Sequence, residues 1–144
     1  MSKKFYASIP GNYPVCECGD CPKAANCLHQ IAYQKLMESE KYVRLINPRL
    51  CTKDDSCIFF RNATPMVYAF GFSNFQKYML PHQYKMFMEK LIEVFGRNPY
   101  YERRRGATAM PKKEQDLILQ TLRDVGVTQE MQFDKYIQAP NWDD

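Results

Sequence analysis

Histidine is scarce in this sequence, and several familiar catalytic patterns are absent from it. Only two of the 144 residues are histidines, His29 and His82, and neither lies in a recognisable nucleophile or metal motif. No Gly-rich phosphate loop is present, and the acidic pair Asp54-Asp55 lies in a polar turn. We therefore expect a non-enzymatic protein and infer no small-molecule substrate.

Long apolar runs are also missing. No segment has the roughly 18 consecutive apolar residues that a membrane-spanning helix needs. Lys3 and Lys4 are not followed by an apolar stretch, because Gly11 and Pro14 interrupt the sequence, so no signal peptide is predicted. We expect a cytoplasmic protein in a reducing compartment, where disulfides are exceptional.

The overall composition is typical of a globular protein. Hydrophobic residues make up 45% of the chain and charged residues 25%, which allows a core and disfavours global disorder. The length predicts a single domain over residues 1–144. Within it we expect a cysteine-rich arm, helix and strand over 1–60 and a helical part over 73–130. The fold class is predicted as mainly α (α+β), a helical bundle with a small β-hairpin and a cysteine-rich N-terminal arm.

The first half is predicted to contain one helix and the hairpin. Asp20 as N-cap and Pro22 in the first turn predict a helix over 22–38, after an irregular arm over 1–20. A strand is expected over Tyr42–Ile46, and it is expected to pair with a second over Met66–Phe72.

The second half reads as a series of helices. Ser73–Gln76 fits a capping box that starts a short helix broken at Pro81, and a longer helix follows up to Gly96. A short helix is expected from Asn98, and a longer one from Pro111 to Gly126. The tail holds four expected core anchors, which are Phe133, Tyr136, Ile137 and Trp142.

Six cysteines occur in two groups. They follow the spacing C-x-C-x2-C-x5-C, then C-x5-C after a gap. Four thiolates satisfy a tetrahedral Zn²⁺ site that can stabilise a loop-rich region. The predicted ligands are Cys16, Cys21, Cys27 and one or both of Cys51 and Cys57. An iron–sulfur cluster would use the same ligands.

Three other interpretations of the cysteines remain open. They could be buried free thiols, since cysteine behaves as a small apolar residue, or they could form disulfides. Thiol-redox chemistry at Cys18 and Cys21 is the one enzymatic exception, because this C-x2-C pair precedes the predicted helix. His29 is a further candidate ligand, but a continuous helix would point it about 200° away from Cys27, so the two would not share one ion.

Positive charge is concentrated in one segment. Six basic residues and one acid give residues 97–113 a local net charge of +5. Arginine suits phosphate and guanine edges, and tyrosine can stack on bases. The candidate nucleic-acid-binding residues are Arg97, Tyr100, Tyr101, Arg103, Arg104, Arg105, Lys112 and Lys113. A solvated basic surface is the alternative.

The order helix, glycine turn, short helix, glycine, helix between Leu91 and Val127 resembles a repressor-type helix-turn-helix in outline. The sequence departs from that pattern at three positions. Ile92 lies where a small residue is preferred, and Glu102 and Arg105 lie where apolar residues should pack inward.

Features along nearly the whole chain resemble an uncharacterised family of small bacterial cysteine-containing proteins, a domain of unknown function. The residues that carry the likeness are Cys21-Pro22-Lys23-Ala24, Cys27-Leu28, Asn47-Pro48, Cys51, Cys57, Phe60, Phe95-Gly96-Arg97, Tyr100-Tyr101, Arg104, Gly106, Glu114-Gln115, Phe133-Asp134-Lys135-Tyr136 and Trp142. The resemblance implies one integrated domain. It does not point to any particular activity. Cys18 and His29 are the positions that such a family is least expected to require.

Two functional hypotheses follow. The first is a regulatory protein that contacts nucleic acid through the basic segment, with a structural metal, zinc above all, on its cysteines. The second is a metal-free protein-interaction module that binds a partner or a second copy of itself. Its aromatic surface would comprise Phe70, Phe72, Phe75 and Tyr78.

Overall fold

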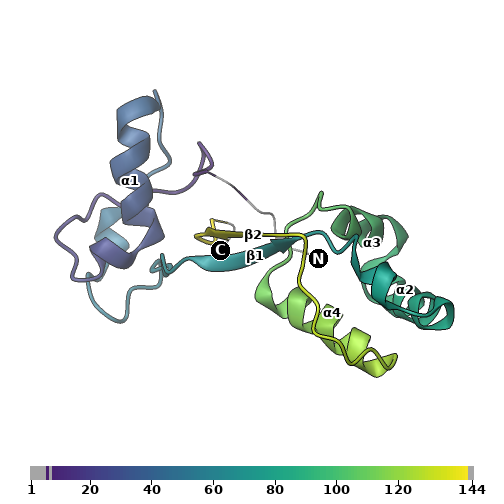
Figure 1. Cartoon of the computed structure of the whole chain (residues 1–144). Helices are drawn as coiled ribbons and strands as arrows, with labels where there is room; N and C mark the ends of the chain where they lie inside the picture. Colours follow the sequence, from purple (N-terminus) through teal and green to yellow (C-terminus); the bar gives the residue numbers. More distant parts are fainter. Residues whose placement is uncertain (1–5, 7, 143–144) are drawn as a thin grey trace. The chain divides into compact units, whose positions relative to one another are not determined.

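The computed structural model describes residue 6 and residues 8–142, and its backbone forms two compact units (Figure 1). The first unit comprises the described residues of Met1–Pro65 and Pro140–Asp144, and the second comprises Met66–Ala139. The single domain expected over residues 1–144 stays a prediction. No helix among the described residues is long and apolar enough to cross a membrane.

The first unit contains one α-helix, α1 (Leu28–Ser39), with the short 3-10 helices η1 (Ala24–Asn26) and η2 (Pro48–Leu50). The predicted helix start at Pro22 is wrong. Cys27 is the N-cap of α1 and has an extended backbone, with φ −110° and ψ 124°. It forms an antiparallel bridge with Asn62, and this bridge separates the turn before it from the helix.

The core of the first unit lies under one face of α1. Leu28, Ala32 and Leu36 recur at four-residue spacing and are all buried. Tyr13, Val15 and Trp142 complete this core. The ring of Trp142 meets that of Tyr13 edge-on, with 5.3 Å between ring centroids. The expected anchoring role of Trp142 is thus confirmed, although it lies far along the chain from α1.

The two-stranded sheet has a different second strand from the one predicted. Strand β1 (Met66–Phe70) pairs antiparallel with β2 (Lys135–Ala139), and Tyr68 lies opposite Ile137. The expected strand over Tyr42–Ile46 is instead held by Val15, whose N–H donates to Arg44 O and whose carbonyl accepts from Ile46 N–H. The backbone groups of Arg44 and Ile46 therefore bond to Val15 within the first unit and not to β1.

The second unit has the predicted order of helices. They are η3 (Phe75–Tyr78), α2 (Pro81–Phe95), α3 (Arg97–Arg104) and α4 (Lys112–Asp124). Gly96 separates α2 from α3 with φ +93°, a conformation that favours glycine. The mainly α fold with one small antiparallel sheet is thus confirmed (Figure 1).

Of two predicted details at the helix starts, the Ser73 cap is wrong and the break at Pro81 is confirmed. Ser73 does not cap η3, because its N–H and its hydroxyl both donate to Asp134 Oδ2, at 3.1 and 2.7 Å. Pro81 begins α2, where its missing N–H is tolerated, and Gln83 Oε1 accepts from Leu80 N–H at 2.8 Å.

Aromatic side chains fill the core of the second unit. Phe72, Phe75, Phe87, Tyr100 and Phe133 pack together with the inner face of α4. The predicted aromatic interaction surface is therefore wrong at two of its four positions, because Phe72 and Phe75 are each only 2% exposed. Of the predicted tail anchors in this unit, Phe133 is buried, whereas Tyr136 is exposed.

Candidate metal centre

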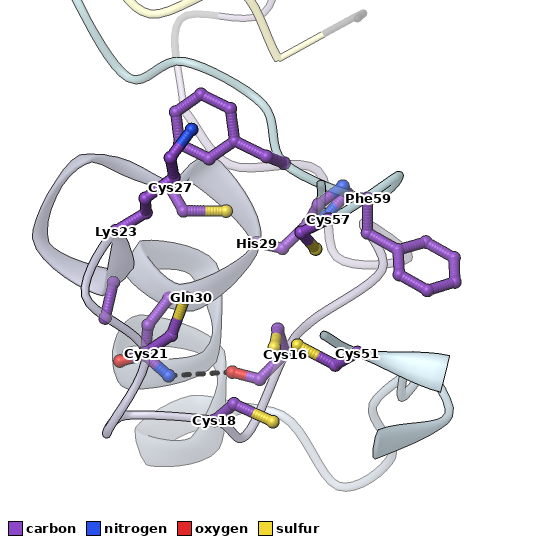
Figure 2. A pocket seen from close by; sticks show the side chains of 12 residues that line it. Cys16, Cys18, Cys21, Lys23, Cys27, His29, Gln30, Cys51, Cys57 and Phe59 are labelled. Carbon is purple, nitrogen blue, oxygen red and sulfur yellow. Dashed lines mark hydrogen bonds between the residues drawn. The ribbon is translucent and has the colours of Figure 1, made fainter. Parts of the chain in front are cut away.

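All six cysteines line one pocket of the first unit (Figure 2). Cys16, Cys18, Cys21 and Cys27 come from the segment before α1, and Cys51 and Cys57 come from the segment after η2. The pocket encloses about 350 Å³, its mouth included. Every one of the six is a free thiol, so the structure does not support the disulfide alternative.

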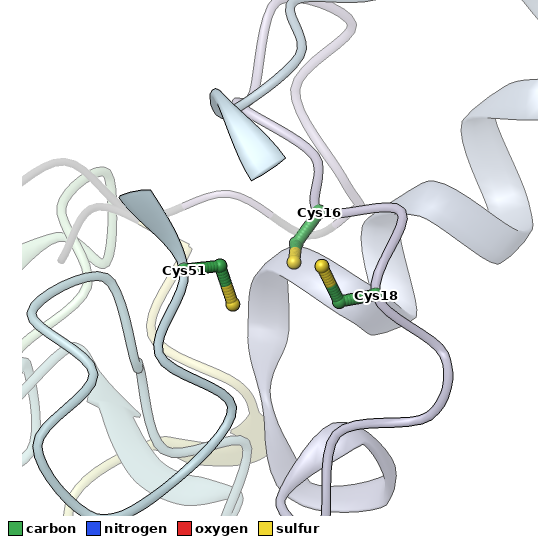
Figure 3. A group of neighbouring side chains, drawn as sticks. All are labelled: Cys16, Cys18 and Cys51. Atoms are coloured by element: carbon green, nitrogen blue, oxygen red, sulfur yellow. The ribbon is translucent and has the colours of Figure 1, made fainter. Parts of the chain in front are cut away.

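Three of these thiols form a tight group, named here the thiol triad. The Sγ atoms of Cys16, Cys18 and Cys51 all lie within 4.8 Å of one another (Figure 3). Cys16 and Cys51 were among the predicted ligands, whereas Cys18 was not. The signal that could have found Cys18 is its spacing from Cys16, because side chains two residues apart in an extended segment point to the same side.

The backbone of Cys16 is fixed by the first turn of α1. Its N–H donates to His29 O at 3.1 Å, and its carbonyl accepts from Gln30 Nε2 at 2.7 Å (Figure 2). Gln30 Oε1 in turn accepts from Gln34 Nε2 at 2.8 Å. Gln30 is buried, so the helix holds this thiol from a position that water does not reach.

Cys51 is placed by a second chain of backbone contacts. The bonds between Val15 and the segment 44–46 bring the start of η2 close to the cysteine-rich arm. Asn47 Oδ1 accepts from Arg49 N–H at 3.0 Å and caps η2. Cys51 N–H then donates to Pro48 O at 3.3 Å. The pairing of Val15 with the segment 44–46 and the Asn47 cap of η2 together place Cys51 beside Cys16.

Two ion pairs join the cysteine-bearing segments. Lys53 Nζ lies 2.9 Å from Asp20 Oδ2, and Lys23 Nζ lies 3.1 Å from Asp55 Oδ1. The hydrogen bond from Lys53 lowers the pKa of Asp20. These pairs are solvent-exposed and add little stability, but each connects one loop of the pocket to the other.

The remaining three thiols, named here the outer thiols, are Cys21, Cys27 and Cys57. All were predicted ligands; the structure places them in the same pocket but outside the triad. Cys21 N–H donates to Cys18 O at 3.2 Å, so the C-x2-C segment forms a turn. Cys57 N–H donates to Asp54 O at 3.2 Å within the polar turn of the second segment.

His29 is held as a structural residue at the pocket wall. Its Nδ1 lies 2.7 Å from Pro14 O, and its ring stacks on Tyr13 with 5.0 Å between centroids. The side chain is 7% exposed. Its position links the arm to α1. The continuous helix on which the exclusion of His29 as a partner of Cys27 depended is absent, because Cys27 precedes α1 with an extended backbone.

Burial favours the protonated form of two thiols of the triad, Cys18 and Cys51. Desolvation raises the pKa of Cys18 to about 12, and hydrogen bonds with Cys51 and Cys16 add to the effect. Desolvation likewise raises the pKa of Cys51. A redox-active thiol needs the opposite shift, toward a lower pKa. A dication, by contrast, replaces the protons and stabilises buried thiolates.

The predicted nucleic-acid contacts divide into buried and exposed residues. Tyr100 is fully buried and Arg103 is 3% exposed, so neither can reach a nucleic acid in this structure. Arg103 Nε lies 2.7 Å from Glu114 Oε1, and its guanidinium lies 4.4 Å from the centroid of the Phe95 ring. Its Nη1 also donates to Pro99 O at 3.1 Å. The assignment of these two residues to a binding surface is therefore wrong.

Three of the other predicted residues are engaged with neighbours. Tyr101 OH contacts Met88 Sδ at 3.6 Å, and Arg104 Nη2 donates to Gln76 at 3.1 Å. Lys112 pairs with Asp116 at 2.9 Å. Arg97, Arg105 and Lys113 are exposed, and they form no ion pair with any residue that the structure describes.

One family model matches residues 1–142, and its description is "Family of unknown function (DUF6078)". The match covers both compact units, from the cysteine-rich arm to the buried Trp142. Comparison with the curated proteins finds no match, and neither does comparison with the solved structures.

Proposed function

The chain belongs to this family of unknown function, and we propose from its own residues that it binds a thiophilic metal ion, zinc above all. One observation carries the proposal. The sulfur atoms of Cys16, Cys18 and Cys51, from two separate segments, lie within 4.8 Å of one another. Thiolate sulfur is the ligand that structural zinc sites use most, at about 2.3 Å.

The other polar side chains that line the pocket have partners. Gln30 is bonded to Cys16 and Gln34, and Lys23 is paired with Asp55 and lies over the ring of Phe60. Sulfur is therefore the donor that the pocket offers to an ion. A structural zinc site has four ligands, so one outer thiol would complete the coordination that the triad begins.

The proposed role of the metal is structural and non-enzymatic. The first unit has a single α-helix and an irregular arm, and zinc binding supplies folding free energy to loop-rich regions of this kind. Binding requires the thiols to lose their protons, so the apparent zinc affinity should fall as the pH falls. The reducing cytoplasm, which keeps thiols free for a metal, is the compartment that we propose.

Metal analysis of protein purified without an affinity tag or added metal tests this proposal. We expect at least one zinc per chain, with thiols that react only after a chelator is added. Cys18→Ser should lower the zinc content, and Ala24→Ser, which changes a pocket-lining residue that is not a ligand, should leave it unchanged. Protein without metal and with six reactive thiols would overturn the proposal.

Nucleic-acid contact by a regulatory protein is a second candidate function, and the exposed cations of the second unit favour it. Arg97, Arg105 and Lys113 come from α3, its C-terminal end and the first turn of α4. Without ion-pair partners among the described residues, their charges can interact with phosphates. Each phosphate contact would contribute about 0.9 to the slope of log affinity against log salt on duplex DNA.

A salt titration with mixed-sequence DNA and RNA tests this second candidate. The triple variant Arg97→Ala/Arg105→Ala/Lys113→Ala should bind more weakly and with a shallower salt slope. Lys77→Ala/Lys85→Ala/Lys90→Ala removes the same charge from exposed positions elsewhere in the unit and serves as the matched control. Equal losses in both variants, or no binding by the wild type at low salt, would contradict the candidate.

A further inference from the structure

The number of thiols in the pocket exceeds what one ion can use. A tetrahedral ion takes four sulfur ligands, whereas six thiols line this pocket. The triad supplies two sulfurs from the first cysteine segment and one from the second, and the outer thiols repeat that division. Figure 2 shows Cys27 and Cys57 above the triad and Cys21 to the left of it.

Backbone pairing holds the outer thiols at the same pocket wall. Leu28 N–H donates to Arg61 O at 2.8 Å, and Cys27 forms an antiparallel bridge with Asn62. Phe60 N–H donates to Cys57 O at 3.4 Å, so the turn that contains Cys57 leads directly into this bridge. The segment before α1 and the segment after Cys57 are therefore fixed to each other, and both Cys27 and Cys57 line the pocket.

We propose that the pocket holds two zinc ions in one six-thiolate cluster, with the triad binding one ion and the outer thiols binding the other. This inference rests on the proposed function. Two tetrahedral ions need eight metal–sulfur bonds, and six thiolates supply eight when two of them bridge both ions. Cys51 is suited to bridge, because it belongs to the triad and lines the same pocket as Cys57, which comes from the same cysteine segment.

The charge of such a cluster follows from its ligands. Six thiols release six protons to solvent, and six thiolates with two dications leave a net charge of minus two. Lys23 lines the same pocket, and Lys53 lies two residues after Cys51. Lys23 is paired with Asp55 and Lys53 with Asp20, so these ion pairs are neutral and the cluster keeps its negative charge.

Native mass spectrometry after zinc reconstitution tests the inference without any variant. We expect two zinc ions per chain that resist a weak chelator. Protein loaded with ¹¹³Cd²⁺ should give two ¹¹³Cd resonances coupled to each other, because that coupling passes through a shared sulfur. Cys27→Ser should retain one ion, whereas Ala24→Ser should retain two.

The possible outcomes separate this inference from the function on which it rests. One tightly bound ion, with Cys21→Ser and Cys27→Ser unaffected, would overturn the two-ion cluster and leave the metal-binding function standing. Two uncoupled cadmium resonances would also overturn it, because the ions would share no sulfur. Absence of any bound ion would overturn both. An iron–sulfur cluster with four irons in the purified protein would overturn the two-zinc cluster, because iron would then occupy the thiolates.

Discussion

The side chain of Arg103 makes its contacts inside the second unit. It lies between the Glu114 carboxylate, the Pro99 carbonyl and the ring of Phe95, with 4% of the side chain exposed. Arg105, two residues along the chain, is exposed. A local charge of +5 therefore overstates the charge that a partner could contact, because sequence does not show which arginine is turned inward.

Arg103→Ala should reduce the free energy of unfolding by about 3–5 kcal/mol, since it leaves the half-buried Glu114 carboxylate without its partner. Arg105→Ala should change stability by less than about 0.5 kcal/mol, as at an ordinary surface position. Urea denaturation followed by circular dichroism compares the two. Equal stabilities would show that the Arg103–Glu114 pair is not important for folding.

Gly71 is a second position where a single added atom should change the stability of the fold. Its φ is +81°, and a Cβ placed there would lie 2.6 Å from Asp134 Oδ2. Gly71→Ala should therefore cost more than about 1 kcal/mol, from both backbone strain and the clash. In thermal denaturation, Gly71→Ala/Asp134→Ala should lose less than the sum of the single variants. Strict additivity would mean that the clash is relieved elsewhere.

Among the elements, α1 connects the fold of the first unit to its metal centre. One face of the helix fills the core, and Gln30 in its first turn holds the carbonyl of Cys16. The hydrogen bonds of this glutamine are directed at the backbone of a ligand, so it acts on the metal through Cys16 without touching it.

Gln30→Ala should weaken zinc binding about 10- to 100-fold, the usual effect of removing a residue that supports a metal ligand. Gln34→Ala, on the same helix and exposed, should have a smaller effect because it contacts only Gln30. Competition with a chromophoric chelator measures both affinities. Unchanged affinity in Gln30→Ala would show that α1 does not position the site.

Helix order in the second half could be predicted from the sequence, because glycine and proline mark the ends of α2, α3 and α4. The pairing of β1 with β2 could not, since the partner strand is more than 60 residues away and a nearer candidate existed over Tyr42–Ile46. Likewise the cysteines suggested a metal, but the triad joins Cys16 and Cys18 with Cys51 from a separate segment, and spacing alone does not show which distant cysteine lies beside them.

At the scale of the whole molecule, the single tryptophan reports on one unit. Trp142 is the only tryptophan of the chain, and it packs in the core of the first unit against Tyr13. Of the four α-helices among the described residues, three lie in the second unit. Fluorescence and far-ultraviolet circular dichroism therefore observe largely different parts of the protein.

Chelation of the metal should shift the Trp142 emission to longer wavelength, because the first unit loses the ion that stabilises its arm. Most of the helical circular dichroism should remain, and zinc should restore the emission. Simultaneous loss of both signals would show that the second unit depends on the metal as well. Loss of helical signal alone would contradict the assignment of the ion to the first unit.

X-ray absorption at the zinc edge of the reconstituted protein tests the central claim most directly. Thiolate coordination predicts a shell of four sulfur atoms around each zinc at about 2.3 Å. A shell of nitrogen and oxygen atoms alone, at about 2.0–2.1 Å, would contradict the account, because the ion would then be bound away from the cysteine pocket.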